Sequence, residues 1–82
     1  MSAHAYIQYA DVPDELAASR CQHVDDATQA QMVAFDGCPL IGQLESVGEQ
    51  LQIEFPFPRS AELRGVLVNW LMHHGISFTV VI

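Results

Sequence analysis

The sequence predicts a small α+β domain, in which helices pack on one face of an antiparallel β-sheet. Apolar and polar residues alternate along residues 50–57, which is the period of a half-buried strand. Residues 61–74 follow a capping serine and precede a glycine stop, and they have the length of a helix. Half of the 82 residues are hydrophobic and 16% are charged, which is the composition of a packed globule. We therefore expect a single compact, acidic domain over residues 1–82.

The first segment, residues 4–10, is predicted to be a strand. Its alternation places Ala5 and Tyr6 on opposite faces, and each face carries a large aromatic side chain. Pro13 and the carboxylates beside it then favour the start of a helix. Proline fits the first helical turn, and the helix dipole favours negative charge there. We expect this helix to end at about His23.

Two interpretations stay open for residues 25–36. Asp26 and Gln29 have the spacing of a capping box, which favours a second helical piece that ends at Asp36 and the glycine after it. This is the interpretation that we prefer. The alternative is a strand over residues 30–35, with the same Asp-Gly pair forming a hairpin turn.

The next two segments are predicted to form a hairpin. Residues 40–47 and residues 50–57 are expected to be strands, joined by a turn at Gly48 and Glu49. Pro56 and Pro58 cannot donate to a strand ladder, so the far end of the second strand should lie at an edge or leave the sheet. The inward face of that strand is predicted to consist of Leu51, Ile53, Phe55 and Phe57.

The chain is predicted to close with a helix over residues 61–74 and a strand over residues 76–82. The expected order is strand, helix, strand, strand, helix, strand, with the first helix possibly broken. This βαββαβ order resembles the ferredoxin-like split βαβ plan, a two-layer sandwich with an antiparallel sheet. The resemblance is one of topology, and that fold hosts many unrelated functions.

The helix over residues 61–74 carries two apolar stripes at about 100° per residue. One sheet buries only one of them. We expect the core stripe to be Leu63, Val66, Leu67, Trp70 and Leu71. The second stripe is predicted to meet another helix, a partner or a second copy of the chain, or else to pack locally or stay exposed; it consists of Ala61, Gly65, Val68 and Met72.

The charge balance excludes several classes of function. Ten carboxylates stand against three arginines and no lysine, which gives a formal net charge of -7. Such a chain repels nucleic acid and anionic membranes and favours a basic partner. Walker-type phosphate loops and Schiff-base chemistry both need a lysine. No segment has the length of a signal peptide's apolar region or of a membrane span, so we expect a cytoplasmic protein.

The carboxylates occur in groups along the chain. Each group also has a local explanation in a helix dipole, a cap or a solvated sheet face, but the near absence of compensating cations favours a role in binding. The predicted acidic binding residues are Asp11, Asp14 and Glu15, then Asp25 and Asp26, and then Glu45, Glu49 and Glu54.

Catalytic and metal motifs are incomplete. Cys21 and His23 are two residues apart, which separates them on a helix, and the chain has no Cys-x-x-Cys pair. Cys38 would need a neighbouring base to act as a nucleophile, and no spacing in the sequence supplies one. In the cytosol both cysteines are expected to be free thiols. We predict no catalytic residue, no metal and no cofactor.

The leading hypothesis is a non-enzymatic interaction protein that blocks or regulates a basic, nucleic-acid-binding surface of a partner protein. In size and charge the chain is similar to the inhibitors that phages encode against host machinery, including anti-CRISPR proteins. The carboxylates would steer the encounter, and Tyr6 or the second helix stripe would supply affinity. The alternative is a homodimeric module of ferredoxin-like fold that binds a small ligand or serves assembly, and that dimerises through the second stripe or an edge strand such as residues 76–82.

Overall fold

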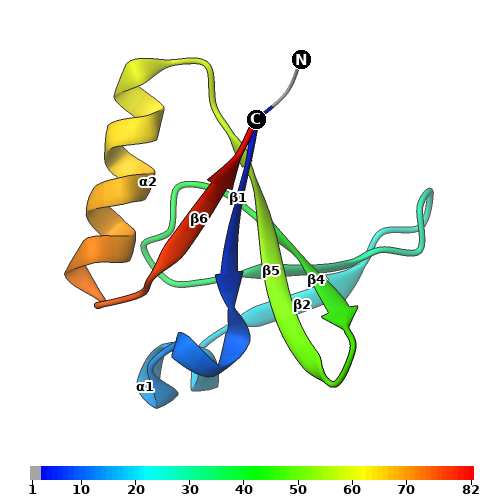
Figure 1. Ribbon diagram of the computed structural model, residues 1–82. Helices are drawn as coiled ribbons and strands as arrows, with labels where there is room; N and C mark the ends of the chain where they lie inside the picture. The colour runs from blue at the N-terminus through cyan, green and yellow to red at the C-terminus, as the bar shows by residue number, and fades with distance from the viewer. Residues whose placement is uncertain (1–2) are drawn as a thin grey trace.

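The computed structural model describes residues 3–82, and in them the chain forms six β-strands and two α-helices (Figure 1). A single 3₁₀ turn over Tyr9–Asp11 follows the first strand. No helix in this part of the chain is long and apolar enough to cross a membrane. The elements are β1 (Ala3–Gln8), α1 (Asp14–Ala18), β2 (Cys21–Val24), β3 (Gln31–Ala34), β4 (Gly42–Val47), β5 (Gln50–Phe57), α2 (Ala61–His73) and β6 (Phe78–Val81).

All six strands belong to one antiparallel sheet with the order β2-β3-β4-β5-β1-β6. Strand β1 lies between β5 and β6, so α2 connects two parallel strands by crossing over β1. The predicted α+β class with an antiparallel sheet is confirmed. The βαββαβ order is not confirmed, because residues 21–34 add the β2–β3 hairpin to the sheet where a long first helix was expected.

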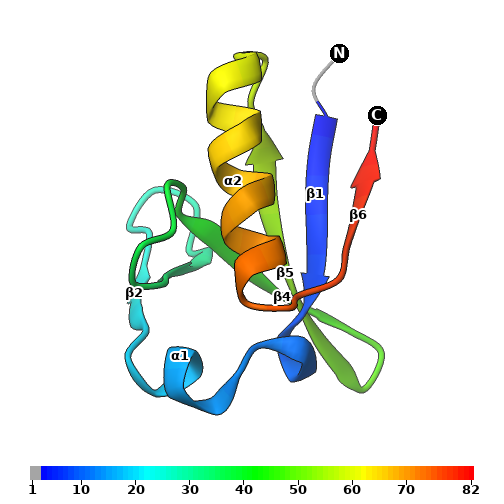
Figure 2. The ribbon, with the colours of Figure 1, turned by 90° about the vertical axis from the view of Figure 1, so that its left-hand side faces the viewer.

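The hydrophobic core lies between the sheet and α2 (Figure 2). Ala5 pairs with Phe55, and Ile7 pairs with Ile53, so β1 and β5 present these four buried side chains on the same face. Leu67 and Leu71 of α2 are fully buried and belong to the same cluster. Burying such side chains stabilises the fold by about 1.5–3 kcal/mol each.

The predicted boundaries of α2 are correct. The Ser60 hydroxyl accepts a hydrogen bond from the Leu63 amide at 3.4 Å, as an N-cap should, and Gly75 follows the helix with a φ of 68°. The predicted core stripe is only partly right, since Leu63 and Val66 are 45% and 46% exposed. Val66 is rotated by about 100° from Leu67, and Leu63 lies in the first turn of the helix.

Trp70 ties α2 to the loop between β3 and β4. Its indole Nε1 donates to the carbonyl oxygen of Asp36 at 3.3 Å, and its ring stacks on Phe35 with the centroids 5.9 Å apart. Gly37 lies under the indole with a φ of 77°, where a side chain would be strained. The Asp-Gly pair therefore does turn the chain between the adjacent antiparallel strands β3 and β4, within a longer loop that packs on α2.

The prediction for residues 14–36 was largely wrong. Helix α1 ends at Ala18, and residues 21–24 and 31–34 are strands. The second of these strands agrees with the alternative interpretation, which predicted a strand over residues 30–35. Asp25 explains the difference, because its carboxylate accepts hydrogen bonds from two backbone amides in the 25–30 loop. Such a side chain stabilises a turn instead of a helix cap. Pairing with β4 then buries Val33 completely.

The end of β5 behaves as its prolines predict. The pairing of β5 with β4 extends only as far as Glu54, while its pairing with β1 includes Pro56 and Phe57. Pro56 therefore lies where β5 has a neighbour on one side only. Leu51 was predicted to point inward, but it is 42% exposed, because it lies next to the hairpin turn at the far end of the strand.

Candidate functional site

The face of the sheet opposite α2 is not covered by any helix in residues 3–82, and we call it the open face (Figure 1). Side chains alternate between the two faces of a strand, so the residues that lie between the core positions point to the open face. Those of β1, β4, β5 and β6 are His4, Tyr6, Gln8, Gln43, Glu45, Val47, Gln50, Gln52, Glu54, Pro56, Thr79 and Val81. None of these residues is an arginine or a lysine.

Two carboxylates lie at the centre of the open face. Glu54 of β5 is directly opposite Tyr6 of β1, and its Oε1 is 3.3 Å from Nδ1 of His4. Glu45 of β4 pairs with Gln52, whose Nε2 donates to Glu45 Oε2 at 3.0 Å. The hydrogen bond from Gln52 holds the Glu45 carboxylate in place, whereas Nδ1 of His4 lies close to Glu54 without forming a hydrogen bond.

The electrostatic effect of these carboxylates is visible at Tyr6. The pKa of its phenol is raised above the usual 10.0, first by desolvation and then by the negative charges of Glu54 and Glu45. A hydrogen bond between Tyr6 and Glu54 also contributes to the raised pKa, so the phenol and the carboxylate form one polar cluster on the open face.

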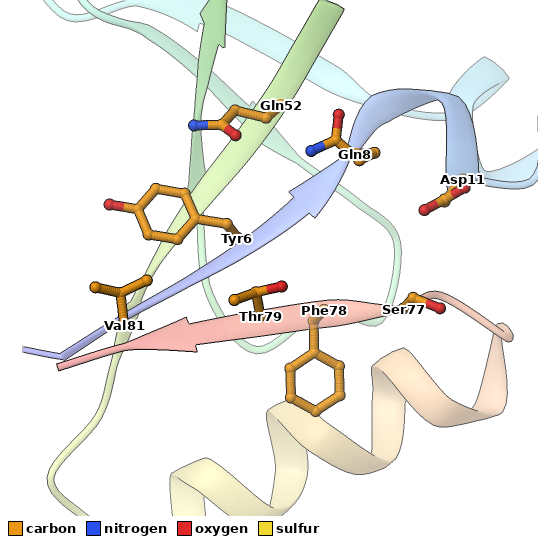
Figure 3. A pocket seen from close by; sticks show the side chains of 8 residues that line it. All are labelled: Tyr6, Gln8, Asp11, Gln52, Ser77, Phe78, Thr79 and Val81. Atoms are coloured by element: carbon orange, nitrogen blue, oxygen red, sulfur yellow. The ribbon is translucent and has the colours of Figure 1, made fainter. Parts of the chain in front are cut away.

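The open face continues into a hollow at the end where β1 runs into the 3₁₀ turn (Figure 3). Figure 3 shows Tyr6, Gln8 and Gln52 on one side of this hollow and Thr79 and Val81 of β6 on the other, whereas Phe78 points away toward the helix. Asp11 and Ser77 complete the lining. The hollow thus has a mixed polar and apolar lining, and it carries one carboxylate.

A second hollow beside the first brings another predicted acidic residue to the same region. It is lined by Asp11 together with Glu49 and its neighbours in the β4–β5 hairpin. Asp11, which lines both hollows, connects the hairpin turn to the open face. The structure therefore brings together four of the eight predicted acidic residues, and we call them the acidic surface: Asp11, Glu45, Glu49 and Glu54.

The other four predicted acidic residues lie elsewhere. Asp25 and Asp26 belong to the loop between β2 and β3, and the Asp25 carboxylate is already engaged with backbone amides there. Asp14 and Glu15 lie on α1, where Glu15 lines a separate hollow with Trp70. Strand pairing thus places these four carboxylates on other elements than the acidic surface, and their role in binding stays a prediction.

The three arginines do not neutralise the acidic surface. The Arg20 guanidinium donates to the carbonyl oxygen of Ala17 and lies over the Tyr9 ring, 5.7 Å from its centroid. Arg64 lies over the Phe57 ring and donates to the Pro58 carbonyl, and it lines a third hollow with Arg59. Within residues 3–82 no arginine forms an ion pair with a carboxylate.

The second stripe of α2 is not covered by the chain itself. Met72 is 69% exposed, and a Cβ atom added at Gly65 would meet nothing within 4 Å. Ala61 is exposed and Val68 is half-buried. The predicted partner of this stripe stays a prediction, and the expected close approach at Ala61 and Gly65 has no counterpart within the described chain.

The cysteine and histidine side chains do not assemble into a centre. Cys21 and His23 lie on strand β2, so their side chains point to the same face, contrary to the helix-based prediction. No three metal-ligating side chains gather in residues 3–82. Burial raises the pKa of the Cys38 thiol above its usual 9.0, which is the reverse of the shift that activates a nucleophilic thiolate.

No protein-family model, curated protein or solved structure matches this chain. The site therefore rests on its own geometry. Sequence reasoning identified the carboxylates and Tyr6 but missed His4, Gln43 and Gln52, which share the open face with them. Their alternation with core residues was visible in the sequence, but nothing there showed that α2 leaves their face uncovered.

Proposed function

We propose that this protein is a non-enzymatic interaction domain that binds a basic surface of a partner protein through its acidic surface. The observation that carries the proposal is the placement of Glu45 and Glu54 at the centre of an uncovered sheet face, with Asp11 and Glu49 at its end. The arginines interact elsewhere and leave these four carboxylates to act on a partner.

The charge distribution supports steering as well as contact. The chain has a net charge of -7, and four of its ten carboxylates lie on the acidic surface, which raises the rate of encounter with a cationic surface. Tyr6 is placed beside the carboxylates and is partly exposed, so it can act as an aromatic anchor at the centre of the interface. The glutamine side chains around it supply further hydrogen-bond donors and acceptors.

The partner class follows from the chemistry of the acidic surface. Strongly basic protein surfaces are typical of nucleic-acid-binding sites, where lysine and arginine contact phosphates. The carboxylates of the acidic surface would contact these lysine and arginine side chains in place of the phosphates. The proposed function is therefore to block or regulate a nucleic-acid-binding protein.

We also propose that the fold is related to the ferredoxin-like plan. The β5-α2-β6 unit with β1 inserted between its strands is a split βαβ unit, which supports a relation to the ferredoxin-like plan. In that relation the β2–β3 hairpin stands in for most of the first helix.

The proposal is tested by capture of partners from lysate of the source organism and of its host, at low and at high salt. We expect a basic, nucleic-acid-binding protein that is released at high salt, because charge-steered contacts weaken with ionic strength. The captured protein, once purified, should lose a fluorescent oligonucleotide when this chain is added.

A matched pair of variants gives the control. Glu45→Gln with Glu54→Gln should weaken capture by at least about tenfold, since each contact with a charged group contributes roughly 1.5–3 kcal/mol. Asp25→Asn with Asp26→Asn removes the same charge at a distance and should leave capture nearly intact. Equal losses in both variants, or capture that does not respond to salt, would contradict binding through the acidic surface.

A further inference from the structure

Strand β6 is an edge of the sheet without the usual protection against pairing. It is bonded to β1 on one side, and the sheet order places no strand on its other side in residues 3–82. Natural proteins guard such edges with charged side chains, prolines or bulges. The segment from Ile76 to Ile82 contains no charged residue and no proline.

The other edge of the sheet is different. Strand β2 has four residues, and it is flanked by Arg20 before it and by Asp25 and Asp26 after it. Strand β6 has four residues as well, so the difference lies in the charges at both ends of β2, which discourage the addition of a strand. At β6, in contrast, Val81 and Ile82 are 50% and 87% exposed. The two edges differ in chemistry, and only β6 has the features of a strand-pairing surface.

The two ends of β6 carry opposite charges. At its beginning, Ser77 lines a hollow together with Asp11, and this hollow extends along the strand to Val81. At its end, Val80 and Ile82 line another hollow together with Arg59 and Arg64. An antiparallel pair of identical strands brings the end of each strand beside the beginning of the other. In such a pair, Arg59 and Arg64 of each copy would therefore lie near Asp11 of the other copy.

We propose that the occupant of this edge is a second copy of the chain, which pairs antiparallel through β6 to form a twofold dimer with one continuous sheet. Such an interface is isologous, so each contact occurs twice. The repulsion expected between two chains of net charge -7 is small at this edge, because Glu45, Glu49 and Glu54 lie on β4, the hairpin turn and β5, on the other side of β1. The dimer proposal does not rest on the partner-binding proposal, although Asp11 belongs to both surfaces.

The mass of the full chain in solution tests this proposal. Sedimentation equilibrium over a range of concentrations should show a species of twice 9.1 kDa that dissociates on dilution. The variant Thr79→Lys with Val81→Lys places like charges across the twofold axis at exposed positions. Its dimer Kd should rise by at least about 100-fold, since opposed like charges cost several kcal/mol.

The control carries the same added charge elsewhere. Ser46→Lys with Gln50→Lys changes two exposed residues of the β4–β5 hairpin and should leave the dimer intact. Arg59→Asp should raise the Kd by about tenfold, and Arg59→Asp with Asp11→Arg should restore much of the affinity. A chain that stays at 9.1 kDa at all concentrations, or a dimer that survives both lysines on β6, overturns the proposal.

A measurement on the unaltered chain keeps the test valid if a variant fails to fold. Isotope-filtered NMR on a mixture of labelled and unlabelled chains detects contacts between copies only. We expect these contacts along Phe78–Val81, and contacts confined to another surface would overturn the assignment of β6.

Discussion

The two faces of the sheet are built from the same strands, yet they differ in almost every physical property. On the face under α2, Ile7, Ile53 and Phe55 are no more than 1% exposed and pack against the helix. On the open face, the residues between them are Tyr6, Glu54 and Gln52, which carry charge and hydrogen-bonding groups and face solvent. One face therefore stabilises the fold, and the other is free to bind a partner.

This division predicts that substitutions on the two faces act on different measurable quantities. A change under α2 alters the free energy of unfolding, because an interior is close-packed and relaxes little. A change on the open face alters charge and partner affinity and has little effect on stability. The four predictions below test the division, from the largest expected effect to the smallest.

Leu71→Ala should have the largest effect on stability. Leu71 is fully buried in the cluster between α2 and the sheet, and truncating such a leucine costs about 2–5 kcal/mol. Urea unfolding followed by circular dichroism measures the loss. Leu63→Ala is the matched control on the same helix, and with Leu63 45% exposed we expect a clearly smaller loss. Similar losses at both positions would mean that α2 packs differently.

Gly42→Ala should destabilise the sheet by overpacking. A Cβ atom at this position would approach Ile53 Cγ2 to 2.4 Å and Phe55 Cε1 to 2.9 Å, both in the core. Added atoms in a well-packed core cost about 1–3 kcal/mol. Gly65→Ala is the control, since nothing lies near its Cβ and alanine favours a helix. Unfolding in urea should show a loss for the first variant and a neutral or slightly positive change for the second.

Glu45→Gln with Glu54→Gln should lower the pKa of Tyr6 while leaving stability near neutral pH within about 0.5 kcal/mol. The folded-state pKa of Tyr6 is raised, so its contribution to stability is present below pH 10.0 and is lost as the pH rises through the folded-state pKa. Removing the two negative charges removes part of the cause of the raised pKa. Desolvation remains, so the pKa should fall only part of the way.

Alkaline titration of the ultraviolet absorbance of tyrosinate measures this change. Tyr6→Phe identifies the part of the absorbance change that belongs to Tyr6. If the carboxamide variant titrated like the unaltered chain, Glu45 and Glu54 would not be close enough to Tyr6 to act on it.

Met72→Glu should have the smallest effect on the isolated chain. Met72 is 69% exposed, so a charged side chain at this position stays hydrated and stability should change by less than about 0.5 kcal/mol. A large loss of stability in urea would show that the second stripe of α2 is buried in solution. Leu67→Glu, which places the charge at a fully buried position, is the contrast that should prevent folding.

The success of the sequence predictions follows the strength of local signals. The helix over Ala61–His73 was predicted closely because a capping serine and a terminal glycine mark its ends. The strand over Gln50–Phe57 was predicted with its boundaries because its alternation is long and regular. Residues 21–34 were predicted wrongly, since two strands of four residues carry no decisive periodicity and depend on pairing with β4.

For the candidate site, too, some features follow from the sequence and others only from the tertiary structure. Composition alone determined that the chain is acidic and lacks lysine, and the alternation of β5 determined that Ile53 and Phe55 point inward. Only the tertiary structure decided that Asp11 and Glu49 line the same hollow while Asp25 and Asp26 lie apart. The physical reason is that strand register joins residues that are far apart in the chain, and the crossover of α2 over β1 determines which face of the sheet is covered.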